Sequence, residues 1–364
     1  MHVLWFTARS FGDLCSTTQD ALLRGLLNEG HSITLVNGDE MAPFEHAMFE
    51  HVALPVKARR GFQAKTLARS MLTWISQFPD NTGSVAVVEW RIAPWVAPEL
   101  ERRGIAWLLM DRSPPADRGL FARLQWSSWR KAWKLAKNHN RPGSVVSPAH
   151  AEFVKTKTGH ERPVVLEAGV DFHRFVPAAK HDRLTMVYHG RLDRHRGVLA
   201  AVMLTHKAIQ AGLDVQTVFI GEGDAEGQLR AYSEAHDCIT LHPKTDQEHV
   251  AKLLGSCHVG LLPMPANGVW ALASPLKRSE YLAAGLCVFG IDHGGHRLAN
   301  SDPTWMRLVA QHDFLEEGVS YLRELLDHHE SYGQESRRYA EAYLGWQPSI
   351  NDLNDALQGL INAS

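Results

Sequence analysis

Short apolar runs alternate with longer helical patterns along almost the whole chain, and this alternation limits the possible folds more than any other feature. The runs are almost continuously apolar, which is typical of parallel strands buried on both faces. We therefore predict an α/β protein with two doubly wound, Rossmann-like domains that face a cleft. The predicted strands are 3–7, 32–37, 85–89, 106–111 and 144–147, then 185–189, 215–220, 239–242, 259–263 and 287–291, with helices such as 17–29, 199–211, 246–255 and 275–284 between them.

A polar stretch at 169–183 (GVDFHRFVPAAKHDR) separates the two series of strands and has the composition of a linker. We place the N-terminal domain at 1–170 and the C-terminal domain at 171–345. The last helix, 346–364, is expected to pack back towards the N-terminal domain. A chain of 364 residues is also too long for one ordinary core.

Composition excludes several classes of protein. The formal net charge of -2 gives no general attraction to nucleic acid, and no nucleic-acid motif is present. No apolar run approaches the ~18 residues of a membrane span, and the N-terminus lacks the pattern of a signal peptide. The four cysteines are scattered without metal-ligand spacing. We expect a cytoplasmic protein without a bound metal or cofactor.

A loop with two permanent cations follows the predicted strand 185–189. It reads GRLDRHRGV, in which Gly190 permits a tight turn and Arg191 and Arg196 place guanidinium groups near the sheet edge. Guanidinium groups suit phosphate oxygens because they are planar and always charged. The alternative interpretation is that both arginines are solvated loop charges.

The segment SPLKRSEYLAAGLCVFG predicts a helix whose start could bind an anion. Ser274 is a good N-cap and Pro275 a good first residue, so the amides near Leu276 would face a ligand. Lys277 adds a cation where the helix dipole disfavours one, and Glu280 could accept hydrogen bonds from ribose hydroxyls. Alternatively, these two residues form a local ion pair on a surface helix.

Together these segments resemble a GT-B fold glycosyltransferase of the family 4 or group 1 type. The similar residues are GRLDRHRGV, VFIGEGDAEGQL, ITLHPKTDQEHVAKLLGSCHVGLLP and SPLKRSEYLAAGLCVFG. The resemblance implies that the C-terminal domain binds a nucleotide-sugar, with Arg191 and Arg196 on its diphosphate and Glu280 on its ribose. The family's other motif glutamate, eight residues before Glu280, is replaced by Leu272. How the sugar ring is held, and whether the reaction retains configuration, therefore stay open.

Two glycine-containing loops complete the predicted binding site. The loop at 221–227 has the spacing G-x-G-x-x-x-G, which does not fit a dinucleotide fingerprint. By the resemblance, Gly221 and Gly223 pass near the nucleobase. In the loop after the first strand, Gly12 is expected to permit a close approach of the backbone to a ligand.

The predicted chemistry is departure of the nucleotide diphosphate, stabilised by fixed positive charge. Arg191, Arg196, Lys277 and the amides near Leu276 would stabilise the leaving oxygen without a metal. In a retaining reaction, the acceptor proton can pass to the departing phosphate.

An inverting reaction would instead need a carboxylate base. Asp111 and Asp117, in WLLMDRSPPADRG, are the candidates, and Glu89 is a weaker one. Both aspartates could equally form ion pairs that order the loop.

A helix rich in tryptophan and basic residues is predicted within 118–137. Trp126, Trp129 and Trp133 fall on one face. With the basic segment 57–69, this helix could contact a membrane that holds a lipid-linked acceptor. The favoured alternative is a stripe packed in the core with cations on its exposed flank.

We therefore predict a glycosyltransferase of the hexosyltransferase type that moves a sugar from a nucleotide-diphosphate donor to a hydroxyl acceptor, either a glycan or a lipid-linked molecule. Two alternatives remain, a nucleotide-sugar epimerase of the same fold and a non-catalytic protein that binds a sugar nucleotide.

Overall fold

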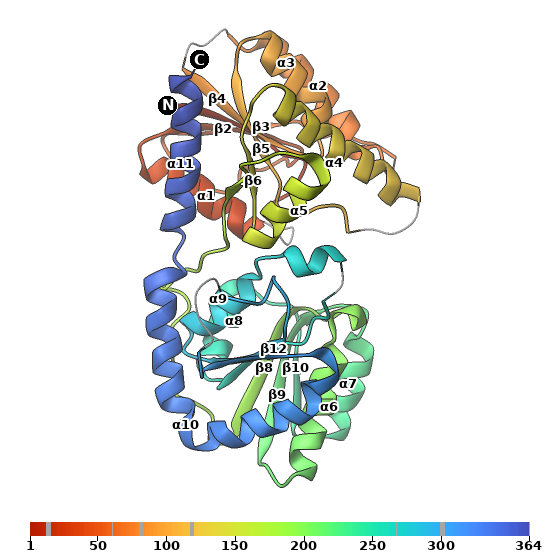
Figure 1. Cartoon of the computed structure of the whole chain (residues 1–364), viewed down its shortest axis with the longest axis vertical. Coiled ribbons are helices and arrows are strands. Elements are labelled where there is room, and N and C mark those ends of the chain that lie inside the picture. Colours follow the sequence, from red (N-terminus) through yellow and green to blue (C-terminus); the bar gives the residue numbers. More distant parts are fainter. Residues whose placement is uncertain are drawn as a thin grey trace. The chain divides into compact units, whose positions relative to one another are not determined.

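The computed structural model describes residues 1–11, 16–59, 61–79, 83–116, 120–266, 268–298 and 303–363. The chain divides into two compact units (Figure 1). Unit 1 contains Met1–Glu167 and Trp346–Ser364, and unit 2 contains Ala168–Gly345. The last helix therefore belongs to the same unit as the N-terminal strands.

Unit 1 is built on a seven-stranded sheet in the order β3-β2-β1-β4-β5-β6-β7. All neighbouring pairs are parallel. The central strands are fully or almost fully buried, as their apolar sequences predict, whereas β3 (FEHVA) is half exposed. The strands are β1 (His2–Phe6), β2 (Ser32–Asn37), β3 (Phe49–Ala53), β4 (Ser84–Glu89), β5 (Ala106–Met110), β6 (Gly143–Val145) and β7 (Val164–Val165).

Helices cover both faces of this sheet. On one face pack α2 (Gln63–Gln77), α3 (Ala93–Arg102), α4 (Leu120–Asn138) and α5 (Pro148–Thr158). The other face is covered by α1 (Ser16–Asn28) and α11 (Gln347–Asn362). These two helices approach closely because α1 has Gly25 where a Cβ atom would collide with Ile350 of α11.

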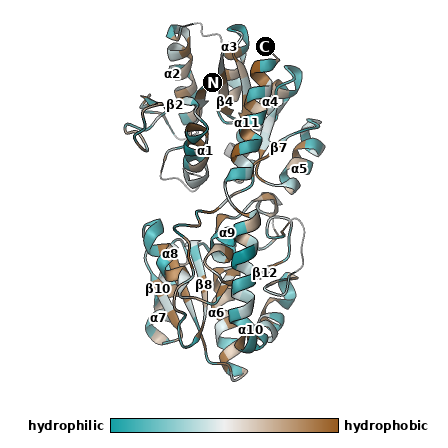
Figure 2. Ribbon diagram, turned by 90° about the vertical axis from the view of Figure 1, so that its left-hand side faces the viewer, coloured by the Kyte–Doolittle hydropathy of each residue, from teal (hydrophilic) through white to brown (hydrophobic). Residues whose placement is uncertain are grey.

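Unit 2 contains a second all-parallel sheet, in the order β10-β9-β8-β11-β12-β13. Its strands are β8 (Leu184–Arg191), β9 (Val215–Glu222), β10 (Ile239–His242), β11 (Val259–Leu262), β12 (Cys287–Ile291) and β13 (Met306–Val309). Its helices are α6 (Val198–Gln210), α7 (Glu226–Ala235), α8 (Gln247–Gly255), α9 (Leu276–Ala283) and α10 (Phe314–Tyr343), with short 3₁₀ turns η1 (Arg194–Arg196), η2 (Gly268–Leu272) and η3 (Gln311–Asp313). In Figure 2 the helices of both units carry hydrophobic and hydrophilic residues, as expected for helices with one side on a sheet.

The strand order reverses direction once in each sheet. In unit 1 the reversal lies between β1 and β4, and in unit 2 between β8 and β11. Ligands of doubly wound sheets bind at the carboxyl ends of the strands at this switch point. The prediction of two doubly wound parallel sheets is confirmed, and it directs attention to the ends of β8 and β11.

Candidate functional site

The carboxyl end of β8 lies against the end of β9 at two glycines. Gly190 has φ +108°, Gly221 has φ +141°, and the two are register partners. A Cβ atom on Gly221 would collide with the carbonyl oxygen of Gly190. Only glycine therefore lets these strand ends approach as they do.

The cation loop, residues 190–197, is organised around the carboxylate of Asp193. Arg191 donates to it through Nη2 at 3.0 Å and Nε at 3.3 Å, and also lies 3.5 Å from Glu222. The hydrogen bond to Asp193 raises the pKa of Arg191. Burial acts to raise the pKa of Asp193, but hydrogen bonds and positive charge hold it below its usual value. The guanidinium of Arg191 thus interacts with two carboxylates, which argues against its predicted contact with the diphosphate.

Arg196 is more enclosed than Arg191, with 16% of its side chain exposed. Its Nε lies 3.5 Å from Asp193, and its guanidinium carbon lies 4.9 Å from the centroid of the Trp270 ring. The sequence interpretation identified Arg196 but not these two contacts.

Lys277 lies in the first turn of α9, on the Tyr188 ring. Its Nζ is 4.0 Å from the ring centroid, and a Cβ atom on Gly190 would lie 3.5 Å from that Nζ. Among the described residues no carboxylate forms an ion pair with it, so the alternative pair with Glu280 is not formed. Burial, and to a smaller extent the charge of Arg196, lowers the pKa of Lys277 to about 7, while Glu280 opposes the change.

Glu280 instead lies against the ring of His189. His189 Nε2 is 3.0 Å from Glu280 Oε2, and both side chains are largely buried. The His189 ring also packs edge-on against Tyr281, with 5.3 Å between centroids. The carboxylate of Glu280 is therefore fixed next to the end of β8.

The start of α9 differs from the predicted one. Pro275, not Ser274, is the N-cap residue, and no side chain caps the helix. Ser274 Oγ accepts a hydrogen bond from the amide of Ala168 at 3.1 Å instead. The capping prediction for Ser274 is wrong because this tertiary contact takes up its hydroxyl, and the amides at Leu276 and Lys277 have no side-chain cap.

Asp111 is fully buried in unit 1. Its Oδ2 accepts hydrogen bonds from the indole nitrogens of Trp129 at 2.6 Å and Trp133 at 2.9 Å, and lies 3.4 Å from His150 Nε2. Both indoles are themselves fully buried, so the prediction of a core tryptophan stripe holds for them. A general base must contact the hydroxyl group of the acceptor substrate, so the burial of Asp111 favours a structural role for it.

Glu89 organises the loop after β1 at the switch point of unit 1. Its Oε2 accepts hydrogen bonds from Thr7 Oγ1 at 2.9 Å and the amide of Ala8 at 2.8 Å. Arg9 and Arg91 lie 3.3 and 3.6 Å from its Oε1. Two further predicted site residues, Gly12 and Asp117, lie outside the described residues.

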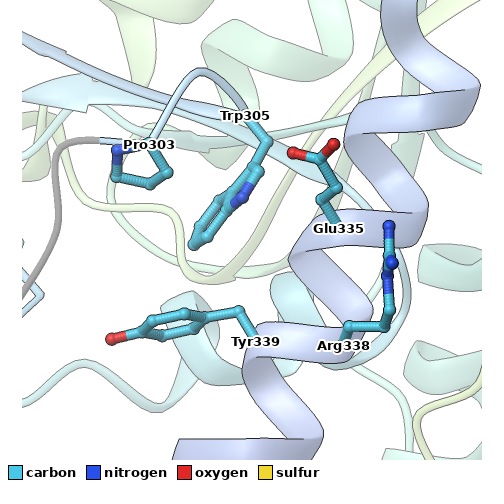
Figure 3. A pocket seen from close by; sticks show the side chains of 5 residues that line it. All are labelled: Pro303, Trp305, Glu335, Arg338 and Tyr339. Atoms are coloured by element: carbon cyan, nitrogen blue, oxygen red, sulfur yellow. The ribbon is translucent and has the colours of Figure 1, made fainter.

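Two surface pockets of unit 2 contain none of the predicted site residues. One, of about 410 Å³, is lined by Pro303, Trp305, Glu335, Arg338 and Tyr339 (Figure 3). The other, of about 560 Å³, lies against Lys180, His258 and His329. The candidate site is thus defined by fixed charges and a helix start rather than by either pocket.

In the part of the chain that the structure describes, no cluster of three or more His, Cys, Asp or Glu residues could hold a metal ion. Within the same residues, no helix combines the length and apolar character needed to cross a membrane.

Comparison with known proteins bears directly on this site. The sequence model of the family Glycosyl transferases group 1 matches residues 183–328, which contain the cation loop and α9. By this match, residues 183–328 are a group 1 glycosyl transferase domain. Among curated proteins, no sequence matches this glycosyltransferase significantly.

Solved structures of low sequence identity share the fold of this glycosyltransferase. Sucrose-phosphate synthase of Thermosynechococcus elongatus matches with a TM-score of 0.79 and 16% identity, over 100% of both chains. Anabaena Alr3699/HepE in complex with UDP matches with a TM-score of 0.69 and 10% identity, over 99% of this chain and 100% of that one. The pneumococcal O-GlcNAc transferase GtfA in complex with UDP and GlcNAc matches with a TM-score of 0.68 and 9% identity, over 99% of both. The predicted GT-B fold is confirmed.

Sequence reasoning missed two residues that contact Arg196. Asp193 lies between the two arginines in GRLDRHRGV, and its sequence position does not distinguish it from a solvated charge of a loop. Trp270 lies in a 3₁₀ turn without periodic pattern. Only the fold brings these two residues to the same guanidinium.

Proposed function

We propose that this glycosyltransferase moves a hexosyl group from a nucleotide-diphosphate sugar to a hydroxyl group of a glycan or a lipid-linked acceptor. The observation that carries the proposal is the position of Lys277. Its ammonium is partly buried at the switch point of unit 2, at the start of α9, without an ion-pair partner among the described residues. Because burying an unpaired charge is costly, such an arrangement is typical of a site that receives an anion.

In this proposal the donor diphosphate binds to Lys277, Arg196 and the amides that begin α9. Glu280 binds the ribose, and Gly190, Gly221 and Gly223 let the backbone approach the nucleotide. Arg191 is not assigned to the diphosphate, since Asp193 and Glu222 hold its guanidinium. The UDP in the HepE and GtfA structures, which share the fold, supports a nucleotide donor.

The reaction breaks the bond between the anomeric carbon and the diphosphate oxygen and forms a bond from that carbon to the acceptor oxygen. Negative charge grows on the departing oxygen, where Lys277, Arg196 and the α9 amides stabilise it without a metal. We propose that configuration is retained and that the acceptor proton passes to the departing diphosphate. Under this scheme no carboxylate of unit 1 acts as general base, which agrees with the burial of Asp111.

Unit 1 is proposed to bind the acceptor, and its α2–α4 layer to contact an anionic lipid surface. The helices α2 and α4 flank α3 and contain no acidic residue. The acidic residues Glu99 and Glu101 of α3 are paired with Arg102 and Arg141. The exposed cations of α2 and α4 are Lys65, Arg69, Arg123, Arg130, Lys131, Lys134 and Lys137. Such a surface suits a lipid-linked acceptor at a membrane interface.

We also propose a cytoplasmic location. Cys238, Cys257 and Cys287 are free and buried, which fits a reducing compartment.

A nucleotide-sugar screen tests the proposed function. UDP-, GDP- and ADP-sugars are added to the wild type, Arg196→Ala and Glu280→Ala, and thermal unfolding is measured. Arg230→Ala, in an exposed pair on α7, is the matched control. We expect at least one donor to stabilise the wild type and the control but neither site variant. A wild-type response that both site variants keep would remove the proposed site.

Turnover separates the enzyme from its alternatives. The preferred donor is incubated with and without candidate acceptors, in the presence and absence of EDTA. We expect transfer that depends on an acceptor and persists in EDTA. Release of a changed sugar without any acceptor would indicate an epimerase, and binding without turnover across a broad acceptor panel would indicate a binding protein.

A further inference from the structure

The guanidinium of Arg196 is held from two sides by residues of different loops. Its Nε lies 3.5 Å from the Asp193 carboxylate, and the centre of the Trp270 ring lies 4.9 Å from its central carbon. A guanidinium has five N–H groups, and only one of them lies on Nε. Within the described residues no hydrogen bond reaches its Nη atoms, so these remain available for a ligand.

Asp193 is itself fixed in place. It is 9% exposed, accepts two hydrogen bonds from Arg191, and accepts a third from the amide of Asp224 at 3.3 Å. A Cβ atom on Gly223 would lie 2.7 Å from its Oδ1, so the glycine leaves room for the carboxylate. The backbone amide of Arg196 also donates to the carbonyl of Asp193 at 2.9 Å. This side of the guanidinium therefore has a rigid support.

Trp270 is fixed on the other side by the segments around it. Its carbonyl accepts a hydrogen bond from the amide of Ala273 at 3.2 Å and lies 3.2 Å from where a Cβ atom on Gly295 would be. The His195 ring lies 5.9 Å from its indole ring. The turn that carries Trp270 thus packs between the cation loop and the loop after β12.

We propose that Asp193 and Trp270 are positioning residues that hold Arg196 with its Nη edge open to the donor diphosphate. This inference rests on the proposed function. Arginine has a long side chain with several rotatable bonds, and fixing it before binding removes an entropy cost from the binding step. A cation–π contact with an indole also keeps the guanidinium plane in one orientation.

The test is a double-mutant cycle on nucleotide affinity. Calorimetry measures binding of UDP, GDP and ADP to the wild type, Trp270→Leu, Trp270→Phe and Arg196→Ala, and to the double variant of Trp270→Leu with Arg196→Ala. We expect Trp270→Leu to weaken the preferred diphosphate roughly threefold to thirtyfold in the wild-type background. It should have no further effect once Arg196 is removed, and Trp270→Phe should recover most of the affinity because it keeps an aromatic face.

Asp193→Asn provides a second arm for the case in which Trp270→Leu does not fold. It keeps the shape of the side chain and removes the charge, so we expect weaker binding that also disappears in the Arg196→Ala background. Independent, additive effects of Arg196 and its two neighbours would overturn the inference, as would unchanged affinity in Trp270→Leu and Asp193→Asn while Arg196→Ala loses binding. Undiminished affinity in Arg196→Ala would instead overturn the diphosphate site of the proposed function.

Discussion

The ammonium of Lys277 lies 4.0 Å from the centre of the Tyr188 ring, where burial lowers its pKa to about 7. Because only the protonated form attracts a diphosphate, we expect nucleotide affinity to fall above about pH 7, approaching tenfold per pH unit. Lys277→Arg should show almost no change between about pH 7 and 9, since arginine stays charged. Calorimetry across this pH range with wild type and variant measures the difference.

The same group gives a prediction for stability without ligand. Folding lowers the pKa of Lys277 from the usual lysine value of about 10.4, so the unfolded chain keeps a proton that the folded chain loses above about pH 7. The free energy of unfolding of the wild type, relative to Lys277→Met, should therefore rise between about pH 7 and 10. If the free energy of unfolding changed with pH in the same way in both proteins, the pKa of Lys277 would not be lowered by folding.

Asp111 is expected to act on stability rather than on the reaction. Asp111→Ala leaves two buried indole N–H groups without their acceptor, so we expect the free energy of unfolding to fall by about 3–5 kcal/mol. Urea unfolding followed by tryptophan fluorescence measures the loss. A variant with wild-type stability and a hundredfold lower kcat would restore the general-base interpretation.

The basic surface of α4 predicts binding to anionic vesicles. The double variant Lys131→Glu and Lys134→Glu reverses two exposed charges, and we expect vesicle affinity to drop about tenfold or more at low salt. Lys252→Glu, on an exposed position of unit 2, is the matched control. Equal sedimentation of all three proteins with vesicles that contain phosphatidylglycerol would contradict the lipid surface.

The contact between α1 and α11 predicts that Gly25→Ala changes protein stability in opposite directions in two backgrounds, the wild type and Ile350→Ala. Gly25→Ala introduces a Cβ atom that collides with Ile350, so we expect destabilisation by about 1–3 kcal/mol. In the Ile350→Ala background the collision is gone, and the same change should stabilise by up to about 1 kcal/mol because alanine favours a helix. Equal effects in both backgrounds, measured by denaturant unfolding, would show that the two helices do not touch at this point.

Much of the fold follows from the sequence because buried parallel strands require continuous apolar runs. The predicted strands at 32–37, 239–242 and 287–291 agree residue for residue with β2, β10 and β12. The strands β3, β7 and β13 were missed because they are short or half-exposed edge strands whose sequences do not form such runs.

The site was only partly predictable for a related reason. Charged residue types near strand ends indicated Arg196, Lys277 and Glu280, but their partners come from distant segments. Glu280 pairs with His189, and Ser274 bonds to the amide of Ala168 instead of capping α9. Both are tertiary contacts that no local sequence pattern encodes.

Nucleotide binding by Lys277→Met is the decisive measurement for the proposed diphosphate site. Calorimetry with the preferred nucleoside diphosphate at about pH 6, where Lys277 is mostly protonated, compares wild type, Lys277→Met and the surface control Lys252→Met. We expect wild type and control to bind equally and Lys277→Met to bind at least about tenfold more weakly, because a charge-assisted contact to phosphate is lost. Equal affinity in all three proteins would show that Lys277 does not bind the diphosphate.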